Sequence, residues 1–169
     1  MSKVEDLKAK VLEAQKNADI ASLYVLEQEA HATFDEDTLQ GFYANILDMA
    51  LEKLTDTLES HKKMDMNDVQ DFATTRALYE YAMEHYSAGQ AKDASALFEV
   101  LSGMTNDDTF AWALKLHWLA SAENISLNDF LEKMADIEKT QERGTFYISV
   151  FTKEAQILLD NAKENGKTE

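Results

Sequence analysis

The chain has 169 residues, enough for one packed core or a short array of helices and too few to predict two independent domains. It has no proline, five glycines and 45% hydrophobic residues, a composition typical of an all-α protein. The formal net charge of −16 at pH 7 argues against nucleic acid and anionic membranes as partners, and the absence of cysteine excludes disulfides, thiol nucleophiles and cysteine-based metal sites.

The N-terminal residues MSKVEDLKAKVLEAQ alternate charged and apolar side chains, which is unlike a secretory signal. No stretch approaches the roughly 18 consecutive apolar residues of a membrane-spanning helix. We therefore expect a soluble, cytoplasmic protein.

Two short helices are predicted first. Apolar residues from Val4 to Ala18 recur at helical spacing, and a second apolar stripe runs from Ile20 to Ala30. Asp19 stands between the stripes as a candidate N-cap, so a helical hairpin is expected here.

A long third helix is predicted after the acidic run Asp35 to Asp37, because carboxylates are favourable at helix N-termini. Its apolar face runs from Leu39 to Leu58. The polar stretch HKKMDMND, residues 61–68, interrupts the apolar period and predicts a break in the chain. We accordingly divide the chain into an N-terminal helical region, residues 1–66, and a second helical region, residues 67–165.

Five further helices are predicted, over residues 69–87, about 92–101, about 107–119, about 126–137 and about 142–161. Gly89 ends the first of them, since glycine adopts the left-handed conformation at little cost. Asn106 or Asp107 is expected to cap the third, and Ser126 with Asp129 the fourth. The predicted fold is all-α, with about eight helices.

Residues 75–108 resemble one tetratricopeptide unit, a helical hairpin of about 34 residues. In the next unit Trp112 stands where the family has a large apolar residue. The resemblance implies stacked helical hairpins held together by packing positions at Leu78, Ala82, Gly89, Ala94, Phe98 and Trp112.

In tetratricopeptide proteins the first helix of each unit lines a concave binding face. The resemblance implies that a client-binding groove is lined by Arg76, Tyr79, Met83, Tyr86, Phe110, Ala113, His117 and Ala120. Tyrosine, methionine and phenylalanine side chains would accept apolar side chains of a client. The same residue types also form helical cores, so the sequence leaves open whether this stripe is a groove or part of the core.

A narrower resemblance covers residues 71–123, which are similar to class II chaperones of type III secretion. Those are small, acidic, all-helical tetratricopeptide proteins of the cytosol that hold hydrophobic translocator subunits before export. This resemblance implies a chaperone that binds apolar segments of a client protein.

Catalytic and metal-binding alternatives have little support in the sequence. The four histidines are dispersed, and Glu27 with His31 lacks the second Glu-x-x-His pair of a di-iron bundle. We expect no cofactor and no metal, and a non-catalytic protein that binds a polypeptide client, with a homodimer left open. A scaffold or adaptor subunit and, more distantly, a helical-bundle enzyme or metal-binding protein remain as alternatives.

Overall fold

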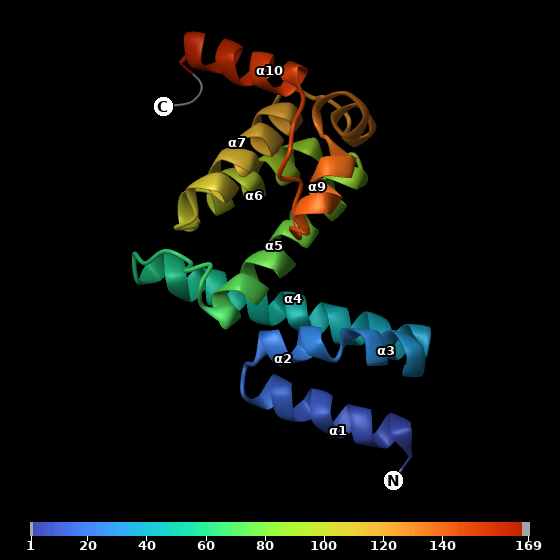
Figure 1. Ribbon diagram of the computed structural model, residues 1–169. Helices are drawn as coiled ribbons and strands as arrows, with labels where there is room; N and C mark the ends of the chain where they lie inside the picture. Colours follow the sequence, from blue (N-terminus) through green and yellow to red (C-terminus); the bar gives the residue numbers. More distant parts are fainter. Residues whose placement is uncertain (1, 167–169) are drawn as a thin grey trace. The chain divides into compact units, whose positions relative to one another are not determined.

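The computed structural model describes residues 2–166, and the protein is all-α as expected (Figure 1). These residues form ten α-helices and one π-helical turn, η1. In chain order the elements are α1 (Lys3–Lys16), α2 (Ile20–Val25), α3 (Glu27–Thr33), α4 (Glu36–Glu59), α5 (Val69–Ser87), α6 (Ala91–Met104), α7 (Asp108–Ala122), α8 (Leu127–Asp129), η1 (Phe130–Met134), α9 (Ile137–Arg143) and α10 (Lys153–Glu164).

The chain divides into two compact units, which we call unit 1 (Met1–Leu78) and unit 2 (Tyr79–Glu169). The division lies inside α5, whereas the sequence placed it after residue 66, at the polar break before that helix. A polar break marks only the end of a helix. The apolar residues of α5 contribute to both units, so the helix itself is shared between them.

Unit 1 is a stack of helices in which α2 and α3 lie between α1 and α4 (Figure 1). Its core consists of one apolar residue from nearly every turn of these helices: Leu7, Val11, Ala14, Ile20, Leu23, Ala30, Phe42, Ile46, Ala50 and Leu54. Asp35 caps α4 as predicted, because its side chain accepts a hydrogen bond from the Thr38 N–H at 2.8 Å.

The single helix predicted from Ile20 to Ala30 is instead two short helices, α2 and α3. They meet at Leu26, whose N–H contacts the carbonyl oxygens of both Ser22 and Leu23. The bond to Leu23 tightens the turn in the manner of a 3₁₀ helix, and this local tightening separates the two elements.

Unit 2 is built on the antiparallel pair α6 and α7 (Figure 1). Gly89 precedes α6 with a φ of 79°, the left-handed conformation predicted for it. The side chain of Asp107 accepts a hydrogen bond from the Phe110 N–H at 3.0 Å and so caps α7. The side chain of Ser126 accepts one from the Asp129 N–H at 3.1 Å.

The helix predicted over residues 142–161 is wrong in its first half. The chain leaves α9 at Gly144, which has a φ of 70°, and residues 144–152 form a non-helical segment that we call the strap. The Asp136 N–H donates to the Val150 carbonyl, and the Thr152 N–H donates to the Met134 carbonyl, both at 2.8 Å. These bonds hold the strap against the preceding turn, so α10 starts only at Lys153.

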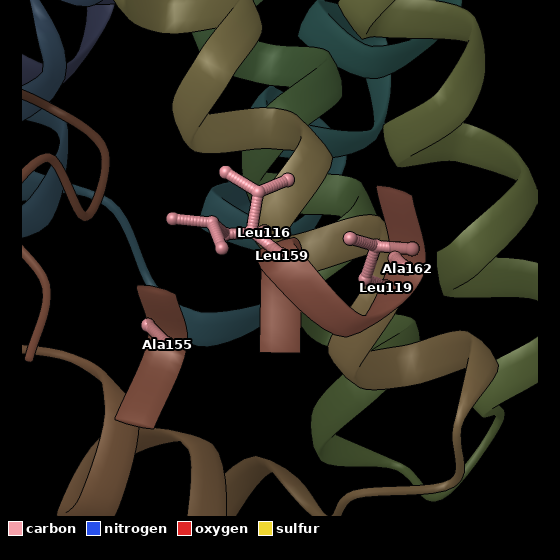
Figure 2. Packing of buried hydrophobic residues seen from close by; sticks show 5 residues of the cluster. All are labelled: Leu116, Leu119, Ala155, Leu159 and Ala162. Atoms are coloured by element: carbon pink, nitrogen blue, oxygen red, sulfur yellow. The ribbon is translucent and has the colours of Figure 1, made fainter. Parts of the chain in front are cut away.

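A separate apolar cluster joins the last helix to α7. It consists of Leu116 and Leu119 from α7 together with Ala155, Leu159 and Ala162 from α10 (Figure 2). The three α10 residues recur at i, i+4 and i+7, so they form a single stripe along the helix. The stripe fastens the C-terminal helix to unit 2.

Candidate functional site

The aromatic stripe predicted as a groove is the core of unit 2. Tyr79 is almost fully buried and packs against Phe98 and Phe110, with ring centroids 6.2 and 6.3 Å away. Phe110 in turn packs against Tyr147 of the strap at 4.4 Å. Such closely spaced, tilted rings stabilise a core beyond their buried area.

A chain of hydrogen bonds crosses this core. The Nδ1 of His117 lies 2.7 Å from the Ala113 carbonyl oxygen, which can only accept, so Nδ1 carries the ring hydrogen. Nε2 of the neutral ring then accepts the hydroxyl hydrogen of Tyr79 at 2.7 Å. The Tyr79 oxygen accepts the Ile148 N–H at 3.1 Å, so each buried polar group has a partner.

Burial governs the ionisation of these groups. Desolvation lowers the pKa of His117 to about 4, and the bond to the Ala113 carbonyl only partly opposes the shift. Desolvation also raises the pKa of the Tyr79 and Tyr86 hydroxyls well above the ordinary value. All three side chains are therefore neutral near pH 7, as buried structural groups should be.

The burial of this stripe corrects the expectation that it is open to a client. Six of the eight predicted groove residues are buried: Tyr79, Tyr86, Phe110, Ala113, His117 and Ala120. The strap occupies the space beside them, with the Phe146 and Tyr147 rings against Tyr79. Within unit 2, the strap therefore covers the stripe.

Of the positions predicted to pack the helical hairpins together, some are buried and others are exposed. Leu78, Ala82, Ala94 and Phe98 are buried, whereas Trp112 keeps 38% of its surface exposed. The Trp112 ring lies edge-on to Phe151 of the strap, with centroids 5.3 Å apart. Trp112 thus covers the strap from outside and does not fill a groove between two helices.

Unit 1 contains a surface cleft that the sequence did not predict. The cleft has a volume of about 370 Å³ and lies between α2 and the first half of α5. It is lined by Ala21, Tyr24, Met66, Asn67, Val69, Phe72, Ala73 and Arg76. We call it the α2–α5 cleft. Of the eight predicted groove residues, Arg76 alone lines it, while Met83 lies half-buried in the second half of α5.

Large apolar side chains are exposed along one wall of the α2–α5 cleft. Val69 and Phe72 keep 69% and 43% of their surfaces exposed, although both lie in the first turn of a helix that is otherwise well buried. Together with Ala73 and Arg76 they follow the i, i+3, i+4, i+7 spacing of one helix face. The wall of the cleft is therefore one continuous helix face.

The far end of the cleft is held by a network around Arg76. Its guanidinium lies 4.0 Å from the centre of the Tyr24 ring and 3.2 Å from Oε1 of Glu27. The other Glu27 oxygen accepts the Tyr43 hydroxyl hydrogen at 2.6 Å, which leaves the Tyr43 oxygen to accept from Nε2 of His31. This network ties α3, α4 and α5 together and fixes the end of the cleft.

Two capping carboxylates, Asp19 and Asp68, flank the near end of the cleft without lining it. Asp19 caps α2 through the Ser22 N–H, and its Oδ1 also accepts from the Gln70 side chain at 2.6 Å. Asp68 accepts the N–H groups of Gln70 and Asp71 at the start of α5. Since both carboxylates contact Gln70, the N-termini of α2 and α5 meet at the same end of the cleft. The hydrogen bonds to Ser22 and Gln70 lower the pKa of Asp19, which keeps its charge near neutral pH.

Two residues, Val69 and Phe72, were a signal for this cleft in the sequence. Val69 and Phe72 follow directly on a polar break, where a helix start usually carries polar or acidic residues. From sequence alone, Val69 and Phe72 indicate only where the helix begins. Their exposure depends on α2, which is distant in the sequence, and local spacing does not reveal it.

Within residues 2–166, no three His, Asp or Glu side chains come together in a way that could hold a metal ion. No helix in that part of the chain combines the length and the apolar character needed to cross a bilayer.

Comparison of the chain with protein-family models, with curated proteins and with solved structures finds no match. The resemblance to tetratricopeptide chaperones therefore stays a prediction, and the function has to be argued from the residues of the α2–α5 cleft.

Proposed function

We propose that the protein is a non-catalytic protein-binding module that holds an apolar segment of another polypeptide in the α2–α5 cleft. The observation that carries this proposal is the exposure of Val69 and Phe72 along a cleft whose opposite wall is Ala21 and Tyr24. Two adjacent apolar side chains left open beside a concave surface are typical of docking sites.

The proposal keeps the kind of function expected from the sequence and moves the site. The buried stripe around Tyr79 is structural, and the α2–α5 cleft takes the binding role. Arg76, which was expected to contact a client, lines the new site as well. A chaperone of this type would shield an apolar client segment, while the net charge of −16 keeps the complex in solution.

The test begins with site-specific crosslinking in the source cell. A photoreactive phenylalanine analogue replaces Phe72 in one variant and Ile157 of α10 in a matched control, since Ile157 is another exposed apolar residue. Mass spectrometry identifies the crosslinked segment. The proposal predicts an apolar segment that crosslinks at position 72 and not at position 157.

A synthetic peptide of the crosslinked segment then provides the quantitative test. We expect the double variant Val69→Gln and Phe72→Gln to bind it roughly tenfold or more weakly than the natural chain, because two apolar contacts are lost. The control variant Leu12→Gln and Ile157→Gln, which alters two other exposed apolar residues, should bind it normally. Equal loss in both variants, or no loss in either, would contradict the proposal.

A further inference from the structure

We infer that the occupant of the α2–α5 cleft is an amphipathic helix of a partner protein, with Lys or Arg residues at the end that lies over Asp19 and Asp68. This inference rests on the proposed function and adds the chemistry of the partner. Three features of the cleft support it: the shape of its walls, the charge at its near end, and the balance of charge at its far end.

The walls of the cleft fit a helix. Val69, Phe72, Ala73 and Arg76 span eight residues of α5, and the seven steps from Val69 to Arg76 cover about 10 Å at 1.5 Å per residue. Ala21 and Tyr24 form the facing wall at the i, i+3 spacing of α2. A third helix packs between two others by inserting a row of side chains spaced three or four residues apart, and about two turns of it would cover the cleft.

The near end of the cleft attracts cations. Asp19 and Asp68 cap α2 and α5, and each helix N-terminus carries a partial positive charge of roughly half a unit, which offsets only part of each carboxylate. The N-termini of α2 and α5, each with its capping carboxylate, together keep a negative charge of about one unit. The neighbouring Asp71 is matched by Lys53, whose Nζ lies 3.4 Å from its Oδ1. Asp65 is also exposed beside the lining residues Met66 and Asn67, so the negative charge at this end comes from the two caps and from Asp65.

The far end of the cleft attracts anions less strongly than the near end attracts cations. The Arg76 guanidinium already contacts Glu27. The Tyr24 ring covers one face of the guanidinium. The surrounding unit is acidic, because residues 1–78 contain 8 Lys or Arg and 16 Asp or Glu, a formal net charge of 8 minus 16, or −8. An acidic partner helix would therefore meet repulsion, whereas a basic one gains at the near end.

Two designed peptides test the inference on the full chain. Each is about 14 residues long with leucines at i, i+3, i+4 and i+7, and they differ only in having three lysines or three glutamates beyond the leucine stripe. Binding is measured by fluorescence anisotropy at about 0.15 M salt, where long-range attraction to the acidic chain is screened beyond about 8 Å. A lysine peptide with the same composition and a shuffled leucine pattern reports charge-driven binding alone.

We expect the lysine peptide to bind roughly five- to tenfold more tightly than the glutamate peptide. The double variant Asp19→Asn and Asp68→Asn should weaken that preference, because asparagine keeps both caps and loses both charges, while Asp65 remains. The matched variant Asp35→Asn and Asp37→Asn removes two exposed carboxylates at the start of α4, away from the cleft, and should keep the preference. The shuffled peptide should bind weakly to every variant.

The other outcomes separate this inference from the proposed function. Equal binding of both leucine peptides that is lost in the Val69→Gln, Phe72→Gln variant would overturn the basic partner and leave the proposed function standing. Failure of the lysine peptide to bind the natural chain overturns the inference, while crosslinking at Phe72 still decides the function. A dimer in sedimentation that the Val69→Gln, Phe72→Gln variant dissociates would make a second copy of the chain the occupant, which also overturns the inference.

Discussion

The hydroxyl of Tyr79 donates its hydrogen to Nε2 of His117 across 2.7 Å, at the centre of unit 2. The two residues come from α5 and α7, and both side chains are buried. The same tyrosine oxygen accepts the Ile148 N–H of the strap. One hydroxyl therefore joins two helices and the strap, and the packing of unit 2 depends on it.

Replacing Tyr79 with phenylalanine tests this dependence. The ring and its aromatic contacts remain, while Nε2 of His117 and the Ile148 N–H lose their partner in a dry core. Each orphaned group costs about 1–3 kcal/mol, so we expect the free energy of unfolding to fall by about 2–6 kcal/mol. Urea denaturation measures the change. The control Tyr81→Phe alters a half-buried tyrosine and should change the free energy by less than about 0.5 kcal/mol.

The pH dependence of stability tests the ionisation of His117. Its pKa is about 4 in the folded protein against the ordinary histidine value of 6.5, so the unfolded chain takes up the proton first as the pH falls. The stability that the folded state owes to a neutral His117 is fully present above pH 6.5. It is lost as the pH falls from 6.5 to 4. The loss amounts to about 3 kcal/mol, from 1.36 kcal/mol for each pH unit.

Urea denaturation at pH values across this range measures that loss. The variant His117→Gln has no titrating ring, so the pH dependence of its free energy of unfolding should be flatter between pH 6.5 and pH 4, whatever its stability at pH 7. Parallel curves for the two proteins would show that the ring is not the group responsible.

Local signals allowed much of the fold to be predicted from sequence. The caps Asp35, Asp107 and Ser126 and the left-handed Gly89 each act within a few residues, so their role can be read from neighbouring positions. The helices that follow Asp35 and Asp107 were predicted close to their observed limits, whereas the single helix predicted from Ser126 to about residue 137 is wrong: α8 ends at Asp129, η1 ends at Met134 and the chain breaks before α9. Local rules were sufficient wherever the cause of an element was local.

The strap and the aromatic core could not be predicted in the same way. The run TFYISVF, residues 145–151, is rich in β-branched and aromatic residues, which favour an extended chain, and the apolar pattern was interpreted as helix instead. Whether Tyr79 faces a client or the core depended on where this run goes. Because its partners on α5 and α7 are distant in sequence, helix spacing left both outcomes open.

Two glycines offer opposite tests of backbone conformation. Gly41 lies inside α4, and a Cβ built there meets no atom within 4 Å, so alanine adds helix propensity without a clash. We expect Gly41→Ala to raise the free energy of unfolding by about 0.5–1 kcal/mol. Gly89 is equally open but has a φ of 79°, and Gly89→Ala should lower it by about 1 kcal/mol. Thermal or urea denaturation should give changes in the free energy of unfolding of opposite sign for the two variants. The space around the two glycines is the same, and only the backbone conformation differs.

The pair of Arg76 and Glu27 tests whether the end of the α2–α5 cleft is held by an energetic contact. Their atoms lie 3.2 Å apart with side chains 29% and 24% exposed, and the Tyr24 ring shields the guanidinium. A double-mutant cycle with Arg76→Leu and Glu27→Gln should give a coupling energy of about 1 kcal/mol, which falls in 1 M salt.

The exposed pair of Lys133 and Asp129 is a matched control for that cycle. Its atoms are 3.8 Å apart and its side chains are 59% and 52% exposed, so the corresponding cycle should give about 0.3 kcal/mol or less. Partial burial strengthens an ion pair because less water screens the charges, and this difference is the basis of the expected contrast. Equal coupling in the two pairs would mean that Arg76 is held mainly by its packing on Tyr24, in which case Tyr24→Leu should destabilise unit 1 more than Glu27→Gln does.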